Sequence, residues 1–114
     1  MKLNIKATNL ELTPELKNYI QTKMDMLERY LGKLKVINSH FEIKKISNHH
    51  LKGEIYGAEA NISIGGDLLR VEKTEKEVFK AIDKVKDHLD LVIKKYKDKK
   101  IGRKTKKLKL GAMV

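Results

Sequence analysis

The sequence predicts a small α+β domain with the element order βαβββα, in which two helices pack on one face of a four-stranded, mostly antiparallel sheet. Two long segments carry apolar residues every three or four positions, which is typical of helices, and four segments alternate apolar and polar residues, which is typical of strands. A Gly-Gly pair at 65–66 joins two of the alternating segments. With 114 residues, the chain is long enough for one core. Packing both helices on one sheet face buries all three apolar surfaces together.

The N-terminal part predicts a strand, a helix and a second strand. Residues 3–7 alternate in polarity and form the first strand. Thr13 and Pro14 are typical of a helix N-cap and its first position, and Gly32 ends the apolar repeat, so we expect a helix from Pro14 to Leu31. Its apolar stripe is Leu16, Ile20, Met24, Leu27 and Leu31. The second strand is expected between Val36 and Ile46, with Ile37, Phe41 and Ile43 as its apolar positions.

The middle of the chain predicts a hairpin. Residues 47–50 have turn composition, and the alternation from Glu54 to Ile64 predicts a long third strand. The glycines at 65–66 and Asp67 are typical of a tight turn. We expect the fourth strand, around residues 69–73, to be short.

The second helix is expected to begin at a capping box, Thr74 to Glu77, and to end near Gly102. Its apolar stripe is Val78, Ile82, Val85, Leu89, Val92, Ile93 and Tyr96. We therefore divide the chain into a folded domain at residues 1–101 and a basic, flexible C-terminal tail at residues 102–114.

Positive charge is concentrated at the C-terminal end. The formal net charge is +11, yet the segment from Lys94 to Lys109 holds ten basic residues and one acidic residue, which leaves +2 for the chain before it. Such a concentration favours a polyanion, above all a nucleic acid, as the partner. A tail that only increases solubility is the alternative.

The sequence offers little material for catalysis. It has no cysteine, and His40, His49, His50 and His88 do not occur at metal-ligand spacing. No glycine-rich phosphate loop or nucleophile motif is present, and we expect no enzyme activity, no cofactor, no metal and no small-molecule substrate. No apolar window reaches 18 residues, and the first residues are polar, so we expect a cytoplasmic protein without a membrane segment.

Two helix flanks contain candidate RNA-binding residues. On the second helix, one flank carries cations, an imidazole and no acid: Lys84, His88, Leu91, Lys95 and Lys99. A chance gap in a Lys-rich helix is the alternative. On the first helix, Lys23 lies between Tyr19 and Tyr30, and Arg29 and Lys33 lie further out, where they can reach phosphate. Tyrosines at such positions also commonly form the edge of a core.

Several of these segments resemble the short form of the ribosome hibernation-promoting factors, also called the ribosome-associated inhibitor family. The resemblance lies in Leu3-Asn4-Ile5, Glu11-Leu12-Thr13-Pro14 and residues 23–30, then in residues 77–83 with Leu89 and residues 95–99, so it covers about residues 1 to 100. It implies a βαβββα domain that lodges against ribosomal RNA in the decoding channel of the small subunit, where it competes with messenger and transfer RNA. Translation is then inhibited in stress or stationary phase.

The resemblance also implies RNA-contact positions. These are Lys23, Arg29, His88, Lys95 and Lys99. His88 stands where lysine is usual, and Leu91 where arginine is common, so two cations are weakened or lost. We expect Lys84, Lys97 and the basic arm, with Lys100, Arg103 and Lys104, to compensate for them, and we count Lys33 as a further rRNA-binding residue.

The sequence therefore predicts a non-enzymatic ribosome-binding inhibitor that is a monomer off the ribosome. A general RNA-binding or RNA-chaperone module with a basic tail is the alternative, because it would use the same phosphate contacts.

Overall fold

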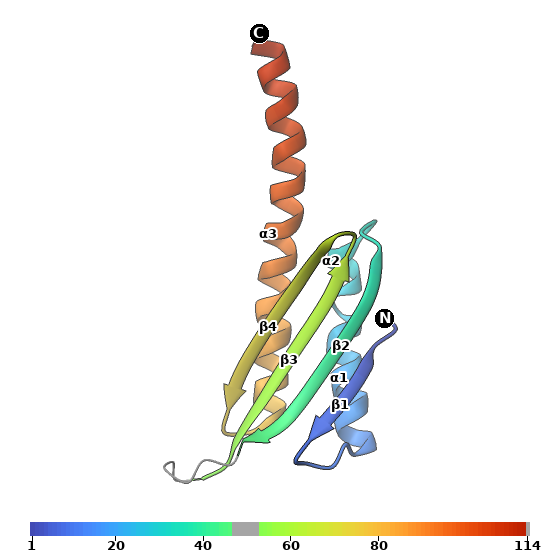
Figure 1. The fold of residues 1–114 in the computed structure, drawn as a ribbon, viewed down its shortest axis with the longest axis vertical. Coiled ribbons are helices and arrows are strands. Elements are labelled where there is room, and N and C mark those ends of the chain that lie inside the picture. The colour runs from blue at the N-terminus through green and yellow to red at the C-terminus, as the bar shows by residue number, and fades with distance from the viewer. Residues whose placement is uncertain (47–52, 114) are drawn as a thin grey trace.

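The computed structural model describes residues 1–46 and 53–113, and it confirms the α+β fold and the order of its elements (Figure 1). The turn predicted at residues 47–50 lies outside the described residues. The elements are β1 Asn4–Thr8, α1 Pro14–Asp25, α2 Glu28–Leu31, β2 Val36–Ile46, β3 Ile55–Ile64, β4 Asp67–Glu75 and α3 Val78–Met113.

The four strands form one sheet in the order β1-β2-β3-β4. β1 pairs with β2 in parallel, and the other two pairings are antiparallel, as expected for a mostly antiparallel sheet. A two-residue turn joins β3 to β4, and Gly65 has a φ of +60°, which glycine adopts without a steric penalty.

The core lies between one sheet face and the helices, which Figure 1 shows behind the sheet. Its sheet side consists of alternate residues that share one face: Phe41, Ile43, Ala58, Ala60, Ile62, Ile64, Leu69 and Val71. The predicted stripe of the first helix is buried in full, and Ile82, Val85, Leu89 and Ile93 of α3 are 0% exposed. The apolar periodicities therefore identified the helix faces correctly.

The first helix is divided, which the sequence prediction missed. α1 ends at Asp25, and the next backbone bonds, Leu27 N to Met24 O (3.0 Å) and Tyr30 N to Leu27 O (3.0 Å), span three residues instead of four. Because Leu27 is 0% exposed and Leu31 is buried, the apolar stripe continues across this tightened turn. The N-cap is as predicted: the Thr13 hydroxyl accepts from the Leu16 N–H at 3.2 Å.

β2 contains an irregularity that changes which residues face the core. Its pairing with β3 shifts between Val36 and Asn38, as in a β-bulge. Ile37, predicted as an apolar position of the strand, is 59% exposed, and Ser39 is buried instead. The Ser39 hydroxyl donates to the backbone carbonyl of Lys2, which ties β2 to the segment before β1.

The end of β4 and the start of α3 also differ from the prediction. β4 has nine residues rather than being short, and Thr74 pairs with Gly57 of β3 instead of capping a helix. The capping box is therefore wrong: α3 begins at Val78, and the Ala81 N–H donates to the Glu77 carbonyl at 3.1 Å. The backbone of Thr74 is thus part of the ladder between β3 and β4.

α3 does not end at Gly102. The helix continues to Met113, and Figure 1 shows its C-terminal part extending beyond the sheet. At 1.5 Å per residue, its 36 residues span about 54 Å. The longest dimension of the molecule is 62 Å.

A polar cluster joins α1 to α3 beside the core. The Tyr19 hydroxyl donates to Asp83 Oδ1 at 2.6 Å, and Lys23 Nζ lies 3.3 Å from the same oxygen. The Tyr19 ring also meets the Phe79 ring edge to face, with centroids 4.9 Å apart. The hydrogen bond to Asp83, followed by burial, raises the pKa of Tyr19 to about 12. Asp83 thus sets the position of the Lys23 side chain.

We expect Asp83→Asn to lower the pKa of Tyr19 toward about 10, because a neutral amide no longer favours the protonated phenol. In the folded protein the raised pKa contributes stability below about pH 10, and this contribution is lost as pH rises toward 12, so the wild type and the variant should converge in stability there. At neutral pH the variant should lose about 0.5–1 kcal/mol, since Asp83 is partly exposed. Tyrosinate absorbance and thermal unfolding against pH measure both effects.

Asp87→Asn is the matched control, because Asp87 lies on the same helix, is 77% exposed and contacts only Lys86, at 3.9 Å, among the ion pairs of the described residues. An unchanged tyrosine titration in Asp83→Asn would contradict the assignment.

Candidate nucleic-acid interface

The flank of α3 that lies beside β4 carries four of the predicted RNA-binding residues. Lys84, His88, Lys95 and Lys99 are all exposed. Leu91 lies among them and is 56% exposed. Ile82, Val85, Leu89 and Ile93 of the apolar stripe are buried, and this flank lies beside that stripe, so it faces solvent over about four turns.

Lys84 is not a free cation. Its ammonium pairs with the carboxylate of Glu75, which belongs to β4. The helix flank contains no acid of its own, as predicted, but the neighbouring strand supplies one. Lys84 and the Lys76 N–H together lower the pKa of Glu75. A helical wheel cannot reveal this pairing, because it contains only one element.

The candidates on α1 and α2 lie on the other side of α3. Lys23 is held by Asp83 and lies 5.3 Å from the centroid of the Tyr19 ring. Arg29 is exposed, with its guanidinium 5.1 Å from the Tyr30 ring, and Lys94 of α3 lies 4.9 Å from that ring. Two cations therefore flank Tyr30 at the contact between the helices.

Lys33 and Lys97 extend this second group. Lys33 is exposed, and Lys97 reaches back over Gly32, where its Nζ lies 3.5 Å from the position that a Cβ would occupy. The predicted residues thus form two groups, one beside β4 and one beside α1 and α2, rather than a single row. Lys100, Arg103 and Lys104 belong to the helical part of the chain beyond Lys99, the last residue whose side chain is described.

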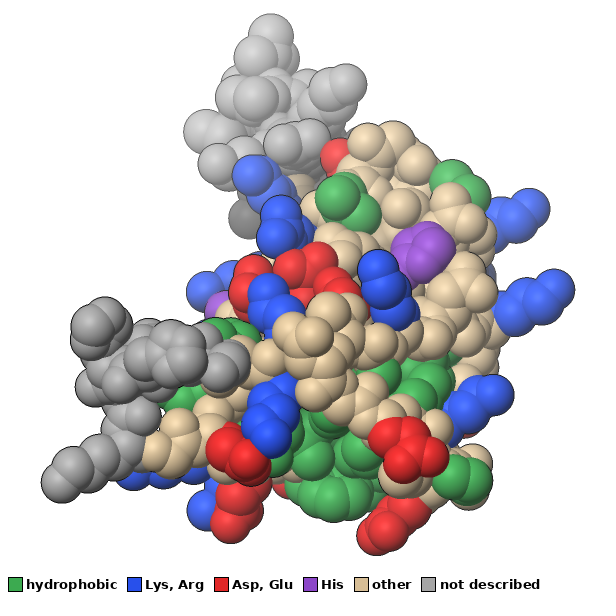
Figure 2. Space-filling view, turned by 60° about the horizontal axis from the view of Figure 1, so that its bottom comes forward, with side chains coloured by type: hydrophobic (Ala, Val, Ile, Leu, Met, Phe, Trp, Pro, Cys, Tyr) green, Lys and Arg blue, Asp and Glu red, His purple; other side chains and the backbone are tan. Residues whose placement is uncertain are grey.

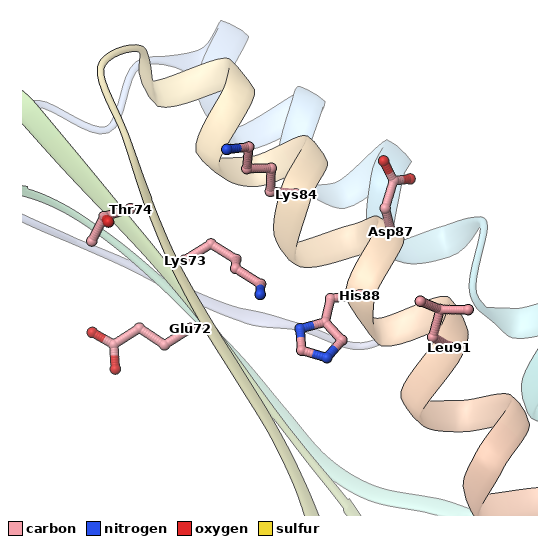
Figure 3. Close-up of a pocket in the computed structure, with 7 residues that line it drawn as sticks. All are labelled: Glu72, Lys73, Thr74, Lys84, Asp87, His88 and Leu91. Carbon is pink, nitrogen blue, oxygen red and sulfur yellow. The ribbon is translucent and has the colours of Figure 1, made fainter.

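Lys73, which sequence reasoning missed, joins the group beside β4. It lines an open groove of about 900 Å³ together with Lys84, His88 and Leu91 (Figure 3). The alternation of the strand could have predicted this position. Lys73 follows Leu69 and Val71 at steps of two residues, so it lies on the same face of the sheet, which α3 covers.

The opposite face of the sheet has balanced charge. Arg70 pairs with Glu59 at 2.9 Å and with Glu72 at 3.6 Å, and Lys44 pairs with Glu72 at 3.6 Å. Hydrogen bonds from Asn61 and Arg70 lower the pKa of Glu59. Figure 2 shows acidic and basic side chains intermixed over the surface that it presents. This face therefore offers no concentrated positive charge.

Other kinds of site find little support in the described part of the chain. Within residues 1–46 and 53–113, no three His, Asp or Glu side chains come together in a way that could hold a metal ion. None of the described helices combines the length and the apolar character needed to cross a membrane.

Comparisons with known proteins agree with the fold and indicate a family. The family described as Sigma 54 modulation protein / S30EA ribosomal protein matches residues 3–101. The chain is 29% identical over 106 residues to a protein of Staphylococcus aureus (strain COL) named Ribosome hibernation promotion factor, and 27% identical over 97 residues to one of the same name from Lactococcus lactis subsp. cremoris (strain MG1363). These matches cover 93% and 85% of this chain but 53% and 50% of the relatives, so the chain spans about half of their length.

Two solved structures share the fold. The N-terminal domain of Thermus thermophilus Protein Y superposes with a TM-score of 0.69 at 25% identity, covering 84% of this chain and 99% of that one. A ribosomal subunit interface protein from Coxiella burnetii gives a TM-score of 0.65 at 18% identity, covering 85% and 98%. With the family match extending over residues 3–101, the chain belongs to the Sigma 54 modulation protein / S30EA ribosomal protein family, the group that contains the ribosome hibernation promotion factors.

Proposed function

We propose that this protein is a cytoplasmic ribosome hibernation factor that binds RNA of the small ribosomal subunit. It occupies the decoding channel, excludes messenger and transfer RNA, and so inhibits translation under stress. Family membership and the names of the two curated relatives support the ribosome as partner. Because the chain spans about half of those relatives, the proposal concerns what this domain does by itself.

The position of the cations along α3 is the observation that carries the proposal. Lys95 and Lys99 are exposed, and neither forms an ion pair with any residue whose side chain the structure describes. Their ammonium groups can meet phosphates without breaking an internal contact, and each contact releases condensed counterions. From Lys94 onward the helix carries ten basic residues, these two included, and one acid.

In this proposal, the protein excludes messenger and transfer RNA by filling the channel and not by a chemical reaction. The helices and the sheet enclose one well-packed core, so the domain is a stiff body from which α3 projects (Figure 1). Such a body, held by phosphate contacts, excludes competing ligands by its volume. The mechanism needs no reacting group, and we propose no enzymatic step.

A general RNA-binding module is the second candidate. It is favoured by the same exposed lysines, because contacts to phosphates carry no sequence information. Salt dependence alone does not distinguish the two functions, whereas competition on the ribosome does.

We expect Lys95→Glu combined with Lys99→Glu to weaken binding to small ribosomal subunits by roughly tenfold or more, because two phosphate contacts become repulsive. The slope of log K against log salt should decrease by about 1.4–1.8. Thermal unfolding should change little, because both side chains are exposed. Co-sedimentation with purified subunits over a range of salt concentrations measures the affinity.

Lys6→Glu combined with Lys17→Glu is the matched control. It makes the same change in charge at two exposed lysines, on β1 and α1, which lie outside the α3 flank. Equal weakening by both pairs would show that net charge, rather than the α3 flank, determines binding.

We also expect a transfer RNA anticodon stem-loop, bound to small subunits programmed with a short messenger, to displace this protein in a concentration-dependent way. The reason is that the two ligands would occupy one channel. Filter binding with labelled protein measures the displacement. Saturating stem-loop that leaves the protein bound would reject the decoding channel and favour the general RNA-binding module.

A further inference from the structure

The groove between β4 and α3 has basic side chains on both of its walls. Lys73 enters from β4, and His88 enters from α3, and Figure 3 shows the Lys73 ammonium directed toward the imidazole. Leu91, which is 56% exposed, lies one helical turn further along the same wall. The edge strand β4 and the flank of α3 thus both place nitrogen-bearing side chains in the same groove.

The acids that line the groove are directed elsewhere. Glu72 lies on the opposite sheet face, where it pairs with Lys44 and Arg70 at 3.6 Å. Asp87 points away from the groove in Figure 3 and lies 3.9 Å from Lys86. Among the described residues, no carboxylate forms an ion pair with Lys73 or His88.

The Lys73 ammonium lacks a polar partner within the described part of the chain. Among the described residues, none forms a hydrogen bond or an ion pair with its ammonium group, although Lys73 is only partly exposed. By contrast, the adjacent Lys84 is paired with Glu75. A partly buried, unpaired ammonium directed into a groove favours an anion as the occupant.

We propose that this groove binds the phosphate backbone of an unpaired RNA strand. One phosphate lies between Lys73 and His88, which both donate to it, and the adjoining ribose or base packs against Leu91. This assignment rests on the proposed function and names a part of the RNA surface that the α3 residues alone do not define.

An unpaired strand fits this site better than a duplex does. β4 bounds the groove on one side and α3 on the other, and its volume of about 900 Å³ is open to solvent. A single backbone can enter such a space and turn a base toward an apolar side chain. The backbone of an A-form duplex is held to its complementary strand, so it would contact only the rims.

Lys73→Gln tests the site in the intact chain, with Lys6→Gln as the matched control. Lys6 is likewise a strand lysine outside the ion pairs of the described residues, but it is exposed and lies on β1, at the other edge of the sheet. The probe is a short fluorescent oligouridylate, followed by fluorescence anisotropy over a range of salt concentrations. We expect Lys73→Gln to weaken binding roughly fivefold and to lower the salt slope by about 0.7, and Lys73→Arg to restore both. Lys6→Gln should leave both within about twofold of the wild type.

A second variant and a second probe keep the test decisive. Leu91→Glu, at an exposed position, should also weaken oligouridylate binding, because it places a carboxylate beside the bound phosphate. A short RNA duplex should bind equally well to the wild type and to Lys73→Gln. Equal oligouridylate binding by Lys73→Gln and Lys6→Gln, or an equal loss for the duplex, would overturn the groove assignment. Because these measurements contain no ribosome, failure of the ribosome proposal would appear separately, as loss of co-sedimentation with oligouridylate binding intact.

Discussion

The burial of the α3 stripe against the sheet is the interaction on which the rest of the structure depends. Ile82, Val85, Leu89 and Ile93 are 0% exposed, and burying each of them contributes about 1.5–3 kcal/mol. Rotation of α3 by one residue would expose part of this stripe, so the contact fixes which flank of the helix faces solvent. The buried apolar residues of α3, which contact no ligand, therefore determine the direction in which the exposed lysines point. The observed orientation of α3 also brings Asp83 to Tyr19 and Lys23 on the other flank of the helix.

Most of the fold could be predicted from the sequence because its apolar periodicities are strong and local. The failures occur where pairing between elements overrode a local signal. Thr74 and Glu77 match a helix-capping motif, but Thr74 pairs with Gly57, because β4 continues along β3 as far as Glu75 and its backbone joins the sheet. Ile37 continues the alternation of β2, yet the irregular pairing at Val36 turns it outward. Gly102 is a weak helix breaker, and the helix passes through it.

The candidate site was predicted less completely than the fold, since a binding surface is formed by several elements and a helical wheel describes one. The wheel identified the exposed flank of α3, but it could not show that Glu75 of β4 neutralises Lys84. It also could not show that Lys73 of β4 faces His88. Both relations depend on the register between β3 and β4, in which Ala58 is opposite Lys73. The two-residue turn at 65–66 sets that register.

The ion pairs make the difference in net positive charge between the body of the domain and its C-terminal segment larger than composition alone indicates. On the body of the domain, Lys44, Arg70, Lys84 and Lys86 have carboxylate partners within 4.0 Å, so their fields largely cancel at a distance. From Lys94 onward the chain contains a single acid, Asp98, and the helix carries these cations away from the sheet. A polyanion that approaches the molecule is therefore attracted first to the projecting part of α3. Salt screens this long-range attraction within about 10 Å, whereas the partly buried Lys73 in the groove is screened less. Attraction by the projecting helix and close contact in the groove are thus physically separable steps, and they should respond differently to ionic strength.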